Sequence, residues 1–338
     1  MKNYIIDDVM IVPTMECNFL CGHCAFDSGP DKKGKLNLEQ MCYYVDQLPG
    51  ARTKKLDISG GGEPMLHKDT GKVIAYADSV RGRTGYPQEI TLTTNGHWAT
   101  SEEKARETIE TLRDYGLDKL CISNSRFHNE FNQNVDMESL EKVKKISGSL
   151  EIDTHTSFLH HFPLGRGREG FTKEDFVDET HGCDIFGMID EDANQNVRRG
   201  VSVFPDGLYA CCWKKGMIGE VGDSLNEAVG RALSDPLIIL FGDYGISDPV
   251  KYMKKQGMVS GVDPEIFECS LCEDVFDNES VLKHVKANAE EVLKHFRANE
   301  KVKERVADTP SGTNSHYYTR EEITAILDKQ KLKVLREA

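Results

Sequence analysis

Short apolar segments rich in β-branched residues alternate with segments of helical spacing through the first half of the chain. Strands separated by helices pair in parallel, because each crossover helix returns the chain to the edge of the sheet where the preceding strand began. Such crossovers are right-handed and curl the sheet into a full or partial barrel. The pattern therefore predicts an α/β fold, a partial (β/α)6 barrel. The expected strands are residues 5–12, 55–59, 89–94, 120–123 and 150–156, and the expected helices are 36–48, 69–80, 101–115 and 137–146.

Capping patterns support three helices. Asn37 is placed to cap the first of them. Thr100 and Glu103 form a capping-box pattern at the helix 101–115, and Thr319 and Glu322 form another before a final helix that runs to about residue 336. These patterns predict where the helices begin.

The second half of the chain departs from the alternation. Residues 166–197 are charged, have little periodicity and read as a linker. Residues 201–204 and 208–211 predict a β-hairpin around the turn Asp206-Gly207. Residues 278–306 read as a long, mostly charged helix, and residues 307–318 as a second linker. We expect a smaller second unit there.

Composition excludes several classes of protein. The formal net charge is −14, and a strongly acidic chain is a poor general nucleic-acid binder because phosphate neutralisation needs clustered Lys and Arg. No signal peptide and no apolar run of transmembrane length is visible, so we expect a cytosolic protein with no membrane partner. Disulfides are rare in the cytosol, so the ten cysteines indicate metal or redox chemistry.

Three cysteines, Cys17, Cys21 and Cys24, follow the first expected strand with the spacing C-x3-C-x2-C. Three thiolates on one short loop can bind three irons of a cubane cluster and leave the fourth iron open to another ligand. The alternative is a zinc site completed by His23 or another residue. The glycine run 60–62 after the second strand weakens the zinc interpretation.

The cysteine spacing resembles the signature of the radical S-adenosylmethionine (SAM) superfamily. The resemblance covers roughly residues 5–165 and implies that the amino and carboxylate groups of SAM fill the open position on a [4Fe–4S] cluster. It also implies a flavodoxin- or ferredoxin-type electron donor and reductive cleavage of SAM to a 5′-deoxyadenosyl radical, which abstracts hydrogen from the substrate. In such enzymes the cofactor carries the chemistry and the protein binds and orients it.

Further residues follow from the same resemblance. Gly60-Gly61-Gly62-Glu63 resembles the motif that contacts the amino group of SAM, and Asn95-Gly96 fits the pattern after the third strand, although a plain turn explains it as well. The resemblance implies these SAM-binding residues: Gly61, Gly62, Glu63, Asn95, Ser123, Ser125 and Arg166. His128 is either a general base or a structural histidine, and Arg166 has the fork geometry to pair with a carboxylate.

Later cysteines resemble the ligands of SPASM and twitch extensions, which enclose auxiliary iron–sulfur clusters. Four thiolates saturate one [4Fe–4S] cluster, which favours the shorter twitch type, with zinc as the alternative. The resemblance implies that the auxiliary ligands are Cys183, Cys212, Cys269 and Cys272. Cys211 is then a spare thiol, and we expect Cys42 and Cys121 to be buried structural thiols. The expected domains are a core over residues 1–165, a barrel completion with the auxiliary-cluster unit over 166–275, and C-terminal helices over 276–338.

The resemblance implies an enzyme that acts on a peptide or on a small molecule of the sugar or aminoglycoside kind. Two outcomes are open at this point. In an epimerisation, Cys211 returns a hydrogen atom to the substrate radical. In a dehydrogenation or cross-link, the auxiliary cluster accepts an electron. A contrasting interpretation is a non-catalytic iron–sulfur electron carrier or a zinc-binding adaptor, which has no need of the glycine motif.

Overall fold

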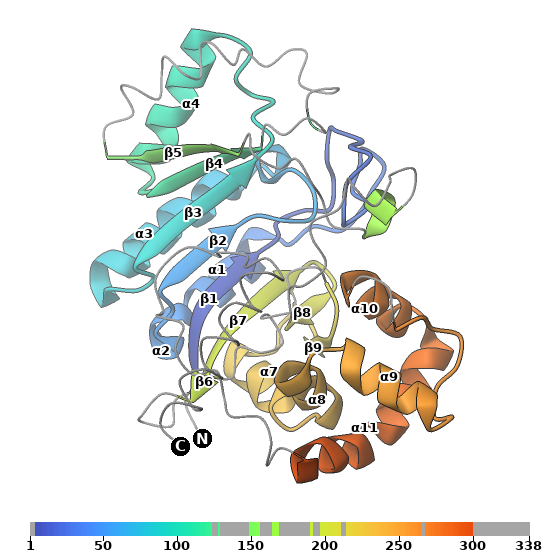
Figure 1. The fold of residues 1–338 in the computed structure, drawn as a ribbon. Helices are drawn as coiled ribbons and strands as arrows, with labels where there is room; N and C mark the ends of the chain where they lie inside the picture. Colours follow the sequence, from blue (N-terminus) through green and yellow to red (C-terminus); the bar gives the residue numbers. More distant parts are fainter. Residues whose placement is uncertain are drawn as a thin grey trace, which may run out of the picture.

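The computed structural model describes residues 4–123, 128, 149–155, 164–168, 190–191, 197–210, 214–264 and 268–299. Within them, strands and helices alternate as the sequence predicts (Figure 1). The strands are β1 (Ile5–Ile11), β2 (Lys55–Ile58), β3 (Glu89–Thr94), β4 (Lys119–Ser123), β5 (Glu151–His155), β6 (Asp190–Glu191), β7 (Val197–Phe204), β8 (Gly207–Tyr209) and β9 (Met217–Gly219). The helices are α1 (Leu38–Val45), α2 (Leu48–Ala51), η1 (Pro64–Leu66), α3 (Thr70–Thr84), α4 (Glu102–Asp114), η2 (Gly165–Arg168), α7 (Leu225–Ala232), α8 (Pro236–Tyr244), α9 (Ser247–Lys255), α10 (Glu268–Phe276) and α11 (Glu279–Asn299).

The described strands form one sheet in the order β5-β4-β3-β2-β1-β7-β8-β9, and β6 pairs with β7. Strands β1 to β5 and β7 run parallel, whereas β6, β8 and β9 are antiparallel additions. The α/β class with a mostly parallel sheet is confirmed, while closure into a partial barrel stays a prediction.

Strand β1 is the centre of the sheet, and its position determines where the functional loops lie. It pairs with β2 on one side and with β7 on the other, so that Ile11 lies opposite both Ile58 and Val203. Because the carboxyl ends of these parallel strands coincide, the loops that follow them meet at one edge of the sheet. Ile6, Val9 and Ile11 are fully buried, which fixes the register of the central strand.

Local signals explain the helix starts. Asn37 caps α1 in a reciprocal capping box with Gln40, as the sequence predicts in part. The expected cap of α4 at Thr100 is wrong by one residue. Ser101 has the extended backbone that an N-cap requires, and its side chain accepts a hydrogen bond from the N–H of Lys104.

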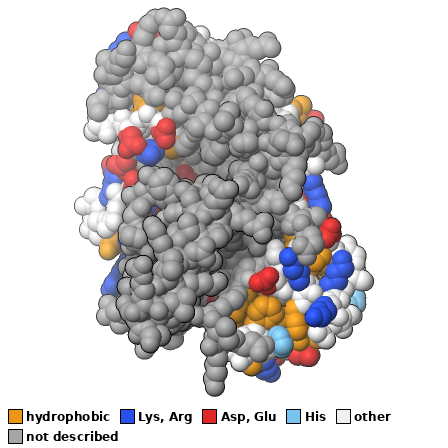
Figure 2. Space-filling view, in the orientation of Figure 1, with side chains coloured by type: hydrophobic (Ala, Val, Ile, Leu, Met, Phe, Trp, Pro, Cys, Tyr) orange, Lys and Arg blue, Asp and Glu red, His pale blue; other side chains and the backbone are white. Residues whose placement is uncertain are grey.

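Helices α7 to α11 form a layer beside β7, β8 and β9 (Figure 1). Helix α11 packs on α8, α9 and α10. It buries Val281, Val285, Ala289 and Val292, a spacing that places them on one helical face. On the face shown in Figure 2, charged side chains of both signs lie among hydrophobic ones over this layer. Sequence patterns did not predict α7 to α10.

Several sequence predictions lie outside the described residues. These are the helix 137–146, the linker 307–318, the final helix, most of the linker 166–197 and the end of the helix 278–306. Among the described helices, none is both long and apolar enough to cross a membrane.

Candidate cluster and cofactor site

The cysteine loop, residues 14–35, leaves β1 and folds back on itself before α1 begins. Thr14 bridges to Lys35, and Glu16 bridges to Gly29. Within the loop, the N–H of Cys17 donates to the carbonyl of Gly29 at 3.1 Å, and that of Cys24 donates to the carbonyl of Cys21 at 3.1 Å. These bonds hold the three cysteines in a tight turn at the carboxyl edge of the sheet.

The three thiols lie close enough to influence one another. Burial, followed by the proximity of the other two thiols, raises the pKa of Cys21 to about 12, and burial raises that of Cys17 to about 11. Backbone N–H groups of Phe19 and Ser28 donate to the sulfurs of Cys17 and Cys24, each at 3.4 Å. N–H donors that point at sulfur stabilise a thiolate, so the loop fits thiolate ligation to iron.

Within the described part of the chain, no three Cys, His, Asp or Glu side chains form a group that could hold a single metal ion. His23, the expected fourth zinc ligand, packs edge-to-face against His128 with ring centroids 4.7 Å apart. Burial lowers the pKa of His128 to about 4.

The glycine run explains how the loop after β2 reaches the cysteine loop. Gly60 and Gly61 have φ values of +71° and +60°. A Cβ atom on Gly62 would lie 2.0 Å from the carbonyl oxygen of Glu16. The N–H of Gly62 donates to Thr14 at 2.8 Å, and the N–H of Glu63 donates to Glu16 at 2.9 Å. The glycines therefore permit backbone contact between the loop after β2 and the cysteine loop. An ammonium group bound here would donate hydrogen bonds to carbonyl or carboxylate oxygens.

Glu63 is the buried acid of this site, and only 2% of the residue is exposed. Its carboxylate accepts hydrogen bonds from the N–H of Met65, the hydroxyl of Thr94 and the N–H of Asn95 at 2.9, 2.6 and 2.7 Å. Burial outweighs these bonds and raises the pKa of Glu63 to about 7. An ammonium group placed beside this carboxylate would stabilise its charged form.

Asn95 connects the end of β3 to the cysteine loop. Its side-chain nitrogen donates to Asn18 at 2.9 Å and lies 3.9 Å from the sulfur of Cys17. Thr94 pairs with Ile122, which places Ser123 on the neighbouring strand end beside Asn95. The structure thus brings Gly61, Gly62, Glu63, Asn95 and Ser123 to the same edge as the cysteines, whereas Ser125 lies outside the described residues.

Arg166 holds the cysteine loop from η2. Its guanidinium donates to the carbonyls of Cys21 and Ser28 at 3.1 and 2.5 Å and to the carboxylate of Asp27 at 2.7 Å. The backbone N–H of Arg166 also donates to the carbonyl of Cys24. Arg166 was expected among the SAM-binding residues and as a partner for a carboxylate; in the structure the carboxylate it pairs with is that of Asp27, and its other partners belong to the cysteine loop.

The later cysteines are described only in part. Cys269 and Cys272 lie one turn apart on α10, and Cys272 is buried. Cys183, Cys211 and Cys212 lie outside the described residues. Of the two cysteines expected to be buried, Cys121 is buried, but Cys42 is only half-buried, because α1 turns Met41, Tyr44 and Val45 to the core and Cys42 is not among them.

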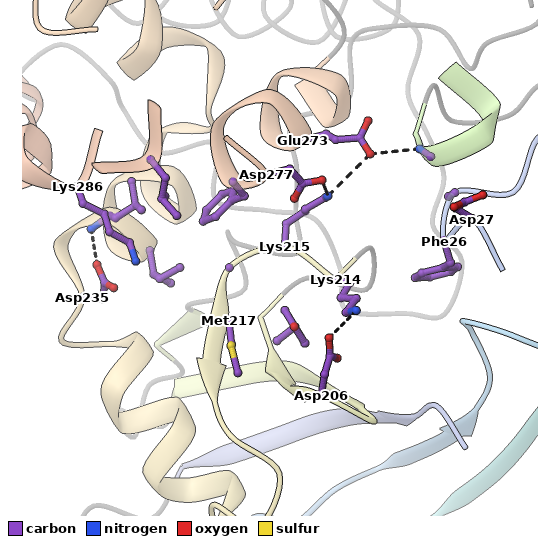
Figure 3. A pocket seen from close by; sticks show the side chains of 18 of the residues that line it. Phe26, Asp27, Asp206, Lys214, Lys215, Met217, Asp235, Glu273, Asp277 and Lys286 are labelled. Carbon is purple, nitrogen blue, oxygen red and sulfur yellow. Dashed lines mark hydrogen bonds and ion pairs between the residues drawn. The ribbon is translucent and has the colours of Figure 1, made fainter. Parts of the chain in front are cut away.

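A cavity of about 490 Å³ separates the cysteine loop from α10 (Figure 3). Phe26 and Asp27 of the loop line one side, and Glu273 of α10 and Asp277, the residue after this helix, line the other. Lys215 projects into the cavity and pairs with Asp277. No sequence pattern indicated this cavity, because its walls come from segments far apart in the chain.

Acidic residues of α10 also tie this helix to η2. Glu273 accepts a hydrogen bond from the N–H of Gly165 at 3.2 Å, and Asp274 pairs with Arg168 at 2.7 Å. Gly165, at φ +52°, approaches Ala25 so closely that a Cβ atom would lie 2.6 Å from its carbonyl oxygen. Thus η2 contacts the cysteine loop and α10 together, a link that no sequence pattern indicated.

Comparison with known proteins identifies the N-terminal part. Residues 11–148 match the model of the Radical SAM superfamily, a match that implies a [4Fe–4S] cluster and SAM. This range includes the three cysteines, the glycine run and Asn95.

Two relatives show how far the likeness extends. The chain is 22% identical over 294 residues to the putative peptide biosynthesis protein YydG of Bacillus subtilis, a match that spans 78% of this chain and 89% of that protein. It is 32% identical over 121 residues to the probable GTP 3′,8-cyclase of Sulfolobus acidocaldarius, which spans 35% of this chain and 34% of the cyclase. The chain therefore covers only about a third of that cyclase.

Solved structures resemble the chain more distantly. A structure of anSMEcpe with bound AdoMet and the Cp18Cys peptide has a TM-score of 0.45 at 14% identity and covers 85% of this chain and 99% of that one. A structure of BtrN with AdoMet and 2-DOIA has a TM-score of 0.41 at 14% identity and covers 65% and 80%.

Proposed function

We propose that this protein is a radical SAM enzyme that cleaves SAM reductively and abstracts a hydrogen atom from a carbon of a peptide. The observation that carries the proposal is the juxtaposition of the three thiols with Glu63 and Asn95 at one sheet edge, inside the range that matches the Radical SAM superfamily. The peptide class is favoured by the match to YydG across most of both chains. A small sugar-like molecule is the second candidate.

The chain's own residues have separate tasks in this proposal. Cys17, Cys21 and Cys24 bind three irons as thiolates, and Arg166 holds their loop in shape. Glu63 accepts a hydrogen bond from the ammonium group of SAM. Asn95, Ser123 and Ser125 contact other parts of the SAM molecule. The [4Fe–4S] cluster, when bound, supplies one electron to the sulfonium, and a flavodoxin- or ferredoxin-type protein provides that electron.

We further propose an auxiliary [4Fe–4S] cluster held by Cys183, Cys212, Cys269 and Cys272 in a twitch-like unit within residues 166–275. The hairpin β7–β8 supports its position, because β7 lies beside β1 and Phe204 packs on Phe26 with ring centroids 5.7 Å apart. A chain that continues from β8 thus starts close to the cysteine loop. Cys269 and Cys272 lie on α10, the helix whose Glu273 and Phe276 line the cavity.

Epimerisation is the reaction that we favour, with Cys211 as the hydrogen donor. Adjacent residues on an extended strand point to opposite faces, so Cys212 can bind the cluster while Cys211 faces the substrate. The substrate radical takes a hydrogen atom from the thiol, and the remaining thiyl radical is reduced by one electron from the flavodoxin- or ferredoxin-type donor and takes up one proton from water.

Anaerobic reconstitution tests the proposal. The protein should bind about eight irons, four for each cubane, and should form 5′-deoxyadenosine from SAM and dithionite. An iron content of about four per chain would contradict the auxiliary cluster. Stoichiometric zinc without SAM cleavage would favour a zinc adaptor, and iron without SAM cleavage would favour an electron carrier.

The peptide reaction is tested in D2O. Epimerisation should place one solvent deuterium at the reacting carbon, because thiol hydrogens exchange with water. Cys211→Ala should keep both clusters and SAM cleavage but lose the epimerised product. A product two hydrogens lighter than the substrate would instead show dehydrogenation.

A further inference from the structure

The turn that follows β3, residues 95–98, brings an imidazole ring back onto a buried amide. Gly96 has a φ of +73°, a backbone conformation that favours glycine, and the turn places His97 beside the side chain of Asn95. The backbone N–H of His97 donates to Oδ1 of Asn95 at 3.0 Å, and Nδ1 of the imidazole lies 3.1 Å from the same oxygen. The ring therefore adds a second contact to a turn that the backbone already closes.

These contacts determine which way the amide of Asn95 points. A backbone N–H needs an acceptor, so the atom beside the N–H of His97 is the amide oxygen, and the amide nitrogen faces the opposite way. That nitrogen carries two hydrogens. It donates to Oδ1 of Asn18 at 2.9 Å and lies 3.9 Å from the sulfur of Cys17, within hydrogen-bond reach of a sulfur acceptor. The end of β3 thus offers the cysteine loop a side-chain N–H donor.

The imidazole of His97 acts as a donor in this arrangement, because an amide oxygen carries no hydrogen. Burial lowers the pKa of His97, so the ring is neutral near pH 7 and carries a single N–H. The contact with Asn95 requires that hydrogen on Nδ1. Donation to the amide oxygen polarises the amide and strengthens the N–H donors at its other end, since linked hydrogen bonds reinforce one another.

We propose that His97 is a positioning residue that holds the amide of Asn95 as an N–H donor to the sulfur of Cys17 and thereby raises the reduction potential of the cluster bound by Cys17, Cys21 and Cys24. This inference rests on the proposed function. Reduction adds one negative charge to the cluster, and N–H donors to its sulfurs stabilise that charge. The backbone N–H of Phe19 also donates to Cys17, but it belongs to the cysteine loop itself. The amide of Asn95 is a donor that a residue outside this loop can orient.

The variants follow from the shape of the imidazole. The side-chain nitrogen of asparagine can occupy the position that Nδ1 has in histidine, so His97→Asn keeps an N–H donor toward Asn95. His97→Leu removes the donor but keeps a side chain of similar size. The matched control is His284→Leu on α11, which removes an imidazole whose Nδ1 contacts a carbonyl of its own helix.

An anaerobic redox titration with dithionite measures the potential in the reconstituted holoenzyme. The cluster of interest is the one whose electron paramagnetic resonance signal changes when SAM is added. His97→Leu should shift its reduction equilibrium about threefold toward the oxidised form, or about 30 mV at 59 mV per tenfold for one electron. His97→Asn and His284→Leu should keep the wild-type potential.

A double-mutant cycle tests whether His97 acts through Asn95. Asn95→Ala removes the donor itself and should lower the potential at least as far as His97→Leu, and N95A/H97L should fall no further than N95A. An unchanged potential in His97→Leu would overturn the inference. So would a full additional shift in the double variant, or an equal shift in His97→Leu and His97→Asn.

The tautomer of His97 gives a readout that needs no cluster. In the full-length protein before reconstitution, nitrogen-15 NMR near pH 7.5 should show the ring hydrogen on Nδ1. A hydrogen on Nε2 would overturn the inference even if the enzyme were active. A wild type that forms no cluster responsive to SAM would instead overturn the proposed function, together with the effect on potential that depends on it.

Discussion

The two cysteine groups are built in opposite ways. The three N-terminal cysteines lie within eight residues of one another and are held by backbone hydrogen bonds at the end of the central strand. Cys269 and Cys272 lie on α10, which is tied to the rest of the site by charged side chains of Glu273 and Asp274. The first site is made by neighbours in sequence and sheet, and the second depends on contacts between distant segments.

This difference predicts unequal sensitivity to mutation. Backbone contacts at a sheet edge leave little room for adjustment, so changes there should disturb the site strongly. Partly exposed ion pairs contribute about 0–1 kcal/mol each, so changes around α10 should act mainly on its local opening.

The largest effect is expected from replacing all three N-terminal cysteines. The variant C17A/C21A/C24A should lose about four irons and all SAM cleavage, because no thiolate remains to bind the first cubane. The auxiliary cluster should remain, which iron analysis and electron paramagnetic resonance can show. The control C42A should keep all its iron. Loss of both clusters from the triple variant would mean that the two sites form together rather than separately.

Gly62→Ala should destabilise the fold strongly for a change of one methyl group. Its Cβ would lie 2.0 Å from the carbonyl oxygen of Glu16, so the backbone of one loop must move, at a cost of about 1–3 kcal/mol. The matched control is Gly82→Ala on α3, where a Cβ meets nothing within 4 Å. That change should stabilise the helix by about 0.5–1 kcal/mol. Urea unfolding of both variants measures the contrast, and equal stability changes would contradict the packing argument.

Sequence reasoning worked where function depends on local order. The strand and helix pattern, the cysteine spacing and the glycine run together predicted which loops share the site edge, because parallel pairing brings successive carboxyl ends together. It failed where long-range contacts decide. The three acceptors of the Arg166 side chain lie in the cysteine loop, far from Arg166 in sequence. No residue near Arg166 in the chain indicates these partners.

The helical layer was missed for a related reason. Helix α8 (Pro236–Tyr244) is apolar on most of its surface. It therefore lacks the pattern of one apolar and one polar face that marks an amphipathic helix. Its apolar side chains are buried by α11, which follows some 40 residues later in the chain. Such mutual burial becomes visible only when both partners are placed.

Arg166→Ala should have an intermediate effect on the first cluster. The side chain makes three hydrogen bonds to the cysteine loop, two of them to backbone carbonyls. Without them the loop should hold its cluster less firmly, so iron should be lost several-fold faster to a chelator, with SAM cleavage falling in step. Arg166→Lys should restore little, since one ammonium group cannot reach three acceptors arranged for a planar fork. If Arg166→Lys restored cluster retention and SAM cleavage fully, the positive charge of Arg166 alone would explain its role.

The smallest effect, and the one that separates the two regions most sharply, is expected from Arg168→Ala. Arg168 pairs with Asp274 and Glu273 of α10, but its side chain is 38% exposed, so global stability should fall by less than about 1 kcal/mol. Local opening of α10 should nevertheless become easier, which hydrogen exchange should detect as faster exchange in residues 268–276 and unchanged exchange in β2 and β3. Arg106→Ala, which removes a comparable exposed pair with Glu102 on α4, should leave exchange in α10 unchanged. If Arg168→Ala also accelerated exchange in the cysteine loop, the two cysteine groups would be coupled through η2, and the contrast between them would be one of degree.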